Sequence, residues 1–528
     1  MKKILFLILI VLIGFAFRFY DLGATPNSLN WDEVSWGYNA YSILTTGRDE
    51  HGEILPLSFK AFGDYKQPAY VYLDVVAIKI FGLTPFAVRF PSALFGTLSI
   101  LSIYFLTREF FAKDKRREAI ALFSALLFAI SPWSIQFSRV AYEANVAVFF
   151  ILTGAVSLLV GARKGNLLLS TLGVILLGIS TYSYHSAKLF TPLLFIALIA
   201  FCWLRFKISK KLIAILLLIF FLITISWVID SRTTARGRSV TFTSYSTPLL
   251  KDSLVKSDQD MKEGFPLAGL IHNRRFVYLN KYLENYLSHF DPNYLFMKGD
   301  DARHHAPRMG VVYLICLPFI LIGLYQLLKK RSADSAIILF WLAISPLASS
   351  IAIDSPNASR SLVMMPAVII MGSLGLTTVY YNFNSKKRLA LFSAISLLYI
   401  INIIFYINNY FVFTNKFHKL YWQYGYKEAI ESTRDYKKVF FLNNIDQGYM
   451  FYLFYEKYNP EKYLAFGGST IRDDACYAIQ SRYFGHCDKK IRKGDVYVTT
   501  AQPIKSRDRL LKEILVDEMN TISIFRAK

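Results

Sequence analysis

The sequence predicts an all-α polytopic membrane domain followed by a small external α/β domain. Of the 528 residues, 54% are hydrophobic and 18% are charged, whereas soluble chains average about 25% charged. Apolar runs close to the length that crosses a bilayer recur up to about residue 410. Much of the net charge of +23 lies in short basic runs between these segments. That placement is typical of cytoplasmic loops, and it argues against a nucleic-acid partner.

About eleven transmembrane helices are expected, because each crossing needs about 20 apolar residues. The candidate spans lie near residues 3–20, 90–110, 118–136, 143–162, 166–183, 187–205, 210–229, 309–328, 335–352, 361–381 and 389–410. The first span follows Lys2 and Lys3 and lacks a clear small-residue cleavage site. We interpret it as an uncleaved anchor in the cell membrane rather than a removed signal peptide.

Segment 68–83 is apolar but short, and Asp74 and Lys79 interrupt it. If Lys2 and Lys3 are cytoplasmic and this segment does not cross, the short basic runs between spans all fall on the cytoplasmic side, namely 113–117, 163–164, 205–211, 329–331 and 386–388. We therefore interpret it as an interfacial helix at the outer surface. The N-terminus is then cytoplasmic, and the regions outside are residues 21–89, 230–308 and 411–528.

The predicted domains are a membrane domain of residues 1–410, which includes the external loops 21–89 and 230–308, and an extracytoplasmic domain of residues 411–528. In the second, a helix-like stretch at 424–436 precedes strand-like runs at 438–442 and 496–499, a mixture typical of α/β domains. Cys476 and Cys487 would lie in a disulfide-permissive compartment. A bridge and two free thiols both remain open, because sequence does not specify the geometry.

The first external loop carries adjacent acids, Asp32 and Glu33, before an expected amphipathic helix at 34–44. Asp32 fits the N-cap of that helix, and the acids also fit a general base beside the membrane. The two roles are compatible. Lys66 stands before the interfacial helix, where it fits either a snorkelling lysine or a point charge for a phosphate.

Further polar residues are expected at the outer ends of spans. Arg89 precedes the second span, and Arg139 and Glu143 follow the third. Intramembrane arginines are costly and often functional. Arg308, in the arginine-rich loop 230–308, and Arg360 are further candidates for an anionic ligand, although long loops also translocate regardless of charge. No metal ligands are assigned, because the adjacent pair His304-His305 is poorly spaced for chelation. A divalent metal is thus not indicated.

These motifs, in this order, resemble the polyprenyl-phosphate-dependent glycosyltransferases of the GT-C fold, with protein O-mannosyltransferases and lipid A aminoarabinose transferases as the closest groups. The resemblance rests on the N-terminal anchor, Asp32-Glu33, Thr46-Gly47, Lys66-Gln67-Pro68 and Arg89-Phe90-Pro91. It covers roughly residues 1–410, and the first 150 residues carry most of it. The family often has Lys-Pro-Pro where this chain has Lys66-Gln67-Pro68. It also often has a His ahead of the arginine that Arg360 matches, where this chain has Ser355-Pro356-Asn357.

The resemblance implies a sugar donor linked to a polyprenyl phosphate and an acceptor on the outer face of the membrane. The acceptor class stays open among lipid, glycan and protein. Asp32 would be the base, Glu33 would assist it, Lys66 would contact the donor phosphate, and Arg89 matches an arginine important in the family. The leaving phosphate is already attached to the sugar, so no nucleotide site is needed, and no Gly-rich phosphate loop occurs. A flippase or transporter of a lipid-linked saccharide is the alternative.

Overall fold

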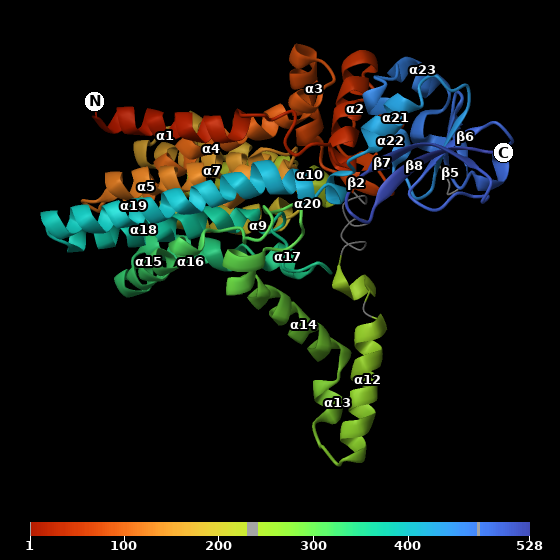
Figure 1. Cartoon of the computed structure of the whole chain (residues 1–528). Coiled ribbons are helices and arrows are strands. Elements are labelled where there is room, and N and C mark those ends of the chain that lie inside the picture. The colour runs from red at the N-terminus through yellow and green to blue at the C-terminus, as the bar shows by residue number, and fades with distance from the viewer. Residues whose placement is uncertain (1, 230–240, 246, 472–475) are drawn as a thin grey trace. The chain divides into compact units, whose positions relative to one another are not determined.

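The computed structural model describes residues 2–229, 241–245, 247–471 and 476–528 (Figure 1). The chain divides into two compact units. Unit 1 contains residues 1–18, 95–137 and 142–404, and unit 2 contains residues 19–94, 138–141 and 405–528. Residues 21–89, predicted as an external loop of a membrane domain of residues 1–410, are thus grouped with the C-terminal residues.

Most of the chain before residue 410 is helical. Its principal helices are α1 (Lys2–Phe19), α2 (Trp31–Thr46), α3 (Pro68–Phe81), α4 (Pro85–Phe110), α5 (Arg117–Ile130), α6 (Pro132–Ser138), α7 (Glu143–Lys164), α8 (Leu167–Ser180), α9 (Ala187–Phe206), α10 (Lys210–Ile229), α12 (Thr247–Lys262), α13 (Ala268–Ile271), α14 (Arg274–Ser288), α15 (Leu317–Lys330), α16 (Ala333–Ile344), α17 (Leu347–Ser350), α18 (Met365–Asn382) and α19 (Ser385–Asn408).

Within the described residues, seven helices are long and apolar enough to cross a membrane, or eight if the bent pair α5 and α6 is one span. Every predicted span contains helix, but α8 and α15 have only 14 residues each. At 1.5 Å per residue they reach about 21 Å, less than the hydrocarbon core of about 30 Å. The count of eleven transmembrane helices is therefore not confirmed.

Helices α15 and α18 of unit 1 cross at two glycines. A Cβ atom on Gly323 would lie 1.9 Å from the carbonyl oxygen of Met371, and one on Gly375 would lie 1.9 Å from that of Phe319. No side chain fits at such distances, so each glycine lets the backbone of the other helix approach. Small residues at helix crossings are typical of membrane bundles, where close packing drives association.

The N-terminal helix is attached to the rest of unit 1 by a buried arginine. Arg18 donates hydrogen bonds to the carbonyl oxygens of Phe128 and Ala129, at 3.2 and 3.1 Å, and to the Ser134 hydroxyl, at 2.6 Å. These acceptors lie where α5 ends and the chain bends by 54° into α6. The carbonyl groups at a helix C-terminus are unpaired and carry partial negative charge, so they suit a guanidinium.

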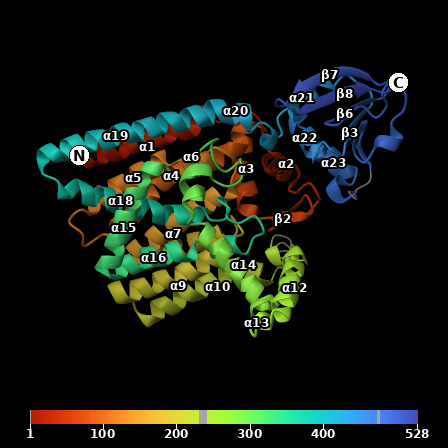
Figure 2. The same cartoon turned by 60° about the horizontal axis from the view of Figure 1, so that its bottom comes forward.

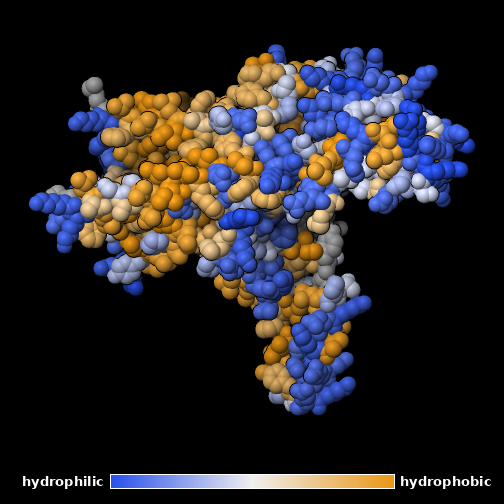
Figure 3. Space-filling model, viewed as in Figure 1, coloured by the Kyte–Doolittle hydropathy of each residue, from blue (hydrophilic) through white to orange (hydrophobic). Residues whose placement is uncertain are grey.

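Helices α12, α13 and α14 form a helical arm within unit 1, visible in Figures 1 and 2. The first part of the predicted loop 230–308, residues 230–240, lies outside the described residues. The surface of unit 1 is largely hydrophobic over its long helices (Figure 3), as expected for a lipid-facing bundle.

The C-terminal part of unit 2 contains a six-stranded mixed sheet. Its strands are β3 (Val439–Leu442), β4 (Tyr477–Ile479), β5 (Arg482–Gly485), β6 (Val496–Thr499), β7 (Arg509–Leu515) and β8 (Thr521–Arg526), in the order β4-β5-β3-β6-β8-β7. Strand β3 is parallel to both β5 and β6, and the other pairs are antiparallel. The accompanying helices are α20 (Thr414–Phe417), α21 (Tyr426–Ser432), α22 (Gly448–Tyr455) and α23 (Pro460–Ala465). The predicted strands and helix are confirmed, and Cys476 is bonded to Cys487.

Candidate active site

The acidic pair Asp32-Glu33 lies in the first turn of α2, within unit 2. The N-cap of this helix is Asn30, whose side chain accepts a hydrogen bond from the Glu33 amide, while the Glu33 carboxylate accepts one from the Asn30 amide. This reciprocal arrangement is a capping box. The N-cap role predicted for Asp32 is therefore wrong. The helix begins at Trp31, three residues before the predicted start, because Asn30 already caps it.

Glu33 is buried, with 1% of its surface exposed, and all its acceptor positions face N–H donors. Oε1 accepts from Arg89 Nε at 2.8 Å and from the Ala141 amide at 3.2 Å. Oε2 accepts from Arg89 Nη2 at 3.3 Å and from the Asn30 amide at 3.1 Å. Such a carboxylate is fully satisfied by the protein, so it has no lone pair turned to a substrate.

Arg89, in the first turns of α4, is completely buried. Besides its two bonds to Glu33, its guanidinium donates to the carbonyl oxygens of Leu22, Pro26 and Ser28, at 3.1, 2.9 and 2.7 Å. A guanidinium has five N–H groups, and all five are used. The geometry thus favours a positioning role for Arg89 over the substrate contact that the sequence predicts.

Arg139 holds the same segment from another side. It is also fully buried, and it donates to the carbonyl oxygens of Tyr20 and Thr25, at 2.6 and 3.2 Å. Its guanidinium lies over the ring of Phe411, 4.6 Å from the centroid. The turn that leads into α2 therefore has its backbone carbonyls bound by two buried arginines, which fixes where the acidic pair stands.

Asp32 differs from its neighbour in exposure and in partner. Its side chain is 40% exposed, and it forms an ion pair with Lys66, whose side chain is 10% exposed. The two atoms, Lys66 Nζ and Asp32 Oδ1, are 2.5 Å apart. The ammonium also lies over the rings of Trp36 and Phe62, 4.2 and 4.7 Å from their centroids. Asp32 is therefore a carboxylate that solvent can reach, and it lies beside a cation packed on two aromatic rings. Of the two adjacent acids, it is the one that can accept a proton.

Lys66 reaches this position because a short hairpin precedes α3. Strand β1 (Phe59–Ala61) pairs with β2 (Asp64–Lys66), and α3 starts two residues later with Pro68 in its first turn. Proline suits that turn because its missing N–H would have no helical partner. The helix predicted at 68–83 is thus present as α3, and its place at the membrane interface stays a prediction.

The remaining predicted residues belong to unit 1. Glu143 is the first residue of α7, and Arg308 is exposed with a left-handed φ of 62°. Arg360 forms an ion pair with Asp354, and its amide donates to Asn357 Oδ1 at 3.0 Å. They therefore belong to a different unit from Asp32, which lies in unit 2.

One buried acid of unit 2 was not assigned from the sequence. Asp74 lies on α3 with none of its surface exposed, and neither carboxyl oxygen has a hydrogen-bond partner within the described residues. Burial, and secondly the charge of Glu33, raises the pKa of Asp74 well above its usual range. The signal in the sequence is an ionisable residue inside an apolar run.

A second unassigned acid is Glu50, which is also fully buried. It accepts hydrogen bonds from the side chains of Asn39, at 3.0 Å, and Ser469. It therefore joins the end of the first loop to the C-terminal part of unit 2. The pairing spans 419 residues, so no local pattern could reveal it.

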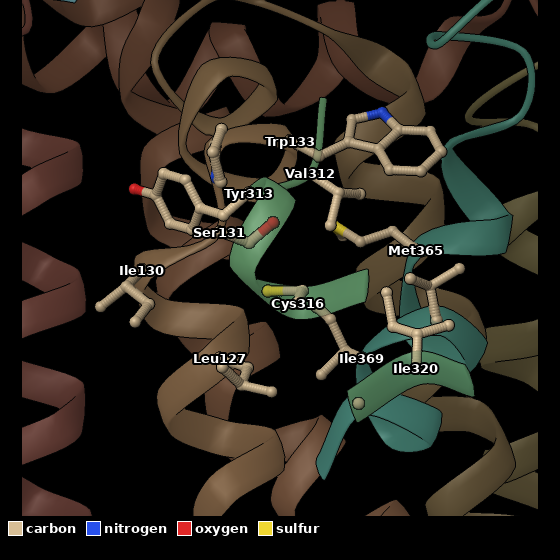
Figure 4. Close-up of a pocket in the computed structure, with 13 residues that line it drawn as sticks. Leu127, Ile130, Ser131, Trp133, Val312, Tyr313, Cys316, Ile320, Met365 and Ile369 are labelled. Atoms are coloured by element: carbon tan, nitrogen blue, oxygen red, sulfur yellow. The ribbon is translucent and has the colours of Figure 1, made fainter. Parts of the chain in front are cut away.

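Unit 1 contains a small pocket between α5, α15 and α18 (Figure 4). Its lining is mostly apolar and includes Leu127, Ile320, Met365 and Ile369. The lining contains no carboxylate, imidazole or amine side chain. Among the described residues, no group of three His, Cys, Asp or Glu side chains is placed to hold a metal ion.

The comparisons with known proteins agree with the resemblance seen in the sequence. Residues 66–229 match the family described as dolichyl-phosphate-mannose-protein mannosyltransferase. A putative mannosyltransferase of Bacillus subtilis, YycA, is 26% identical over 166 residues. That alignment covers 31% of this chain and 23% of the relative, so it spans less than a quarter of the relative's length.

Two solved structures share the fold. ArnT from Cupriavidus metallidurans, bound to undecaprenyl phosphate, has a TM-score of 0.54 and 13% identity, covering 98% of this chain and 97% of that one. The archaeal oligosaccharyltransferase AglB from Archaeoglobus fulgidus, in complex with an inhibitory peptide and a dolichol-phosphate, has a TM-score of 0.51 and 16% identity, covering 86% of this chain and 63% of that one. Both are glycosyltransferases of the GT-C fold, and this chain has that fold.

Proposed function

We propose that this protein is a membrane glycosyltransferase that moves a sugar from a polyprenyl-phosphate-linked donor to an acceptor on the outer face of the membrane. The observation that carries the proposal is the contrast between the two adjacent acids. Asp32 is 40% exposed beside Lys66, whereas Glu33 is enclosed by N–H donors. The mannosyltransferase family match begins at Lys66 itself, and the fold is shared with two enzymes solved with lipid phosphates.

The chemistry follows from these residues. Asp32 accepts the proton of the acceptor hydroxyl or amine as that atom attacks the anomeric carbon. The bond between this carbon and the phosphate oxygen breaks, and the polyprenyl phosphate leaves with the electron pair. Lys66 is the cation that stabilises the charge on the leaving phosphate. When the phosphate takes the ammonium as its partner, the Asp32 carboxylate becomes available to the acceptor.

Glu33, Arg89 and Arg139 act as positioning residues in this scheme. Their buried bonds hold the first turn of α2 and the segment before it, and a catalytic carboxylate must be held to within a fraction of an ångström to be effective. Arg308 and Arg360 are proposed as secondary contacts for an anionic substrate, and Glu143 as a further substrate contact, because each stands in a predicted outer loop or at the start of a span.

The placement in the membrane belongs to the same proposal. We infer a cytoplasmic N-terminus, an extracytoplasmic domain at 411–528, and an active site on the outer face, because this orientation leaves the basic loops inside. Cysteine labelling of intact cells tests it: a probe at residue 450 should react from outside, and a probe at 115 should react only after permeabilisation. Reaction of both from outside would contradict the orientation.

A direct assay tests the activity. Purified protein is incubated with a panel of radiolabelled polyprenyl-phosphate hexoses and with envelope extract as the acceptor, and release of free polyprenyl phosphate is measured together with label in the acceptor. We expect both products with at least one donor, and neither with the Asp32→Asn variant. Movement of an intact donor across the membrane without cleavage would instead support a flippase.

A further inference from the structure

Helix α14 of the arm carries two different faces. Its C-terminal half is hydrogen-bonded to the C-terminal end of α16 and to α17. The Tyr286 hydroxyl donates to the carbonyl oxygen of Ala343 at 2.8 Å, and the Tyr282 hydroxyl donates to that of Leu347 at 3.3 Å. The Asn285 amide donates to the carbonyl oxygen of Ser350 at 3.0 Å. This face anchors the arm to unit 1.

Another face of the same helix is apolar and uncovered. Phe276, Leu279, Leu283 and Leu287 follow one another at spacings of three, four and four residues, which place them in one stripe. They are 46%, 53%, 47% and 65% exposed. The stripe runs for about 16 Å along the helix. An apolar stripe of this size on a segment outside the membrane spans needs a partner.

The arm continues this apolar surface beyond α14. Leu254 and Val255 on α12 are 63% and 67% exposed, and Phe265, Leu267 and Leu270 around α13 are 43%, 50% and 64% exposed. In Figure 3 hydrophobic residues gather along one side of the arm and hydrophilic ones along another. The arm is therefore amphipathic as a whole, not only along one helix.

We propose that the arm lies in the outer surface of the bilayer, with this apolar face inserted among the lipids. The proposal is independent of the enzymatic activity. Three observations indicate that the partner of the apolar face is the bilayer. The arm follows α10, which is long and apolar enough to cross a membrane, and it is anchored to α16 and α17, which together form another such segment. Its apolar stripe thus continues the lipid-facing surface of the bundle.

The second observation is the aromatic content of the anchoring face. Tyr278, Tyr282 and Tyr286 lie along α14 beside the stripe, and tyrosine is enriched at the membrane–water interface because its ring is apolar and its hydroxyl needs a polar partner. The third observation is charge. The arm carries six basic residues, Lys251, Lys256, Lys262, Arg274, Arg275 and Lys281, and five acidic ones, Asp252, Asp258, Asp260, Glu263 and Glu284. This near balance provides no strong attraction to an anionic macromolecule, so apolar burial is the driving force.

Fluorescence quenching in a bilayer tests the proposal. The full-length protein, with the buried Cys202 and Cys316 replaced by alanine, is labelled at Leu283→Cys and reconstituted in neutral phosphatidylcholine vesicles. The matched control is Glu284→Cys, one residue away on the polar side of the helix, where the native side chain is 65% exposed. Phosphatidylcholine carrying a nitroxide on its acyl chain is the quencher.

We expect the label at Leu283 to be quenched and to lie roughly 5–10 Å below the headgroup level, as for an interfacial helix, in low and in high salt alike. The label at Glu284 should be quenched only by a water-soluble nitroxide. Equal responses of the two labels would overturn the proposal. So would a shielded label at Leu283 that no lipid quenches, together with a disulfide-linked homodimer of Leu283→Cys, because the stripe would then be covered by a second copy of the chain.

Discussion

Adjacent acids with opposite environments permit one sharp test of the active-site assignment. Asp32→Asn and Glu33→Gln make the same chemical change, the replacement of a carboxylate by its amide, at neighbouring positions. The structure predicts that the first abolishes activity and leaves the fold intact, and that the second damages the fold.

For Asp32→Asn, we expect a higher activation barrier and hence a lower rate of sugar transfer. Removal of a general base costs about 10²–10⁴-fold in rate, or roughly 3–5 kcal/mol. The stability cost is small, because Asn30 rather than Asp32 caps α2, and an ion pair with a 40% exposed carboxylate contributes about 1 kcal/mol or less. Lys66 also keeps the rings of Trp36 and Phe62.

For Glu33→Gln, the loss is in folding free energy. Both oxygens of Glu33 face two N–H donors each, so an amide turned either way places its own NH₂ group against donors. The buried Arg89 would also lose its counter-charge. Removing one partner of a buried ion pair costs about 3–5 kcal/mol of folding free energy. We therefore expect a low yield of protein or a much lower unfolding temperature.

The assay is the release of polyprenyl phosphate by each purified variant, measured beside its thermal unfolding in the same detergent. Turnover of Asp32→Asn near the level of the unsubstituted protein would refute the assignment of the base. An unfolding temperature of Glu33→Gln equal to that of the unsubstituted protein would refute the structural role of the Glu33–Arg89 pair.

Three further predictions concern stability. Gly375→Ala should lower the unfolding temperature by forcing α15 and α18 apart, at a cost of about 1–3 kcal/mol; Gly372→Ala, whose Cβ would meet its nearest neighbour at an ordinary 3.5 Å, is the control and should change little. Because the pKa of Asp74 is raised by folding, the protein should lose stability as pH rises above the unfolded value of about 4, and Asp74→Asn should remove this loss, which melting curves across pH will show. Replacing Cys476 and Cys487 by serine should cost about 3 kcal/mol for a closed loop of this length, and an unchanged denaturation midpoint would contradict that estimate.

Several features of the site follow from local sequence. The order of the acidic pair, Lys66 and Arg89 was sufficient to suggest the GT-C resemblance, and the short strand-like runs at 438–442 and 496–499 predicted the strands β3 and β6. These signals are local because hydrophobic periodicity and composition reflect the immediate surroundings of each residue. They do not specify partners. The partner of Glu33 is 56 residues away and those of Arg139 are more than 110 residues away, and the chain offers many other charged residues.

The count of spans shows a second limit. Apolarity alone predicted eleven crossings, yet α8 and α15 have only 14 helical residues, and α5 with α6 is bent by 54°. Hydropathy indicates whether a segment prefers the bilayer or water. The ends of a helix depend instead on caps, prolines and neighbouring helices.

The sequence by itself determined that this chain belongs in a membrane, where its apolar segments lie, and which acidic and basic residues stand between those segments. Only the tertiary structure decided which of these residues face one another. Burial gives Asp32 and Glu33 different roles, since one carboxylate keeps 40% of its surface exposed and the other keeps 1%. The physical reason is that the state and use of a charged group depend on its desolvation and its partners, and both are properties of the folded chain rather than of the residue type.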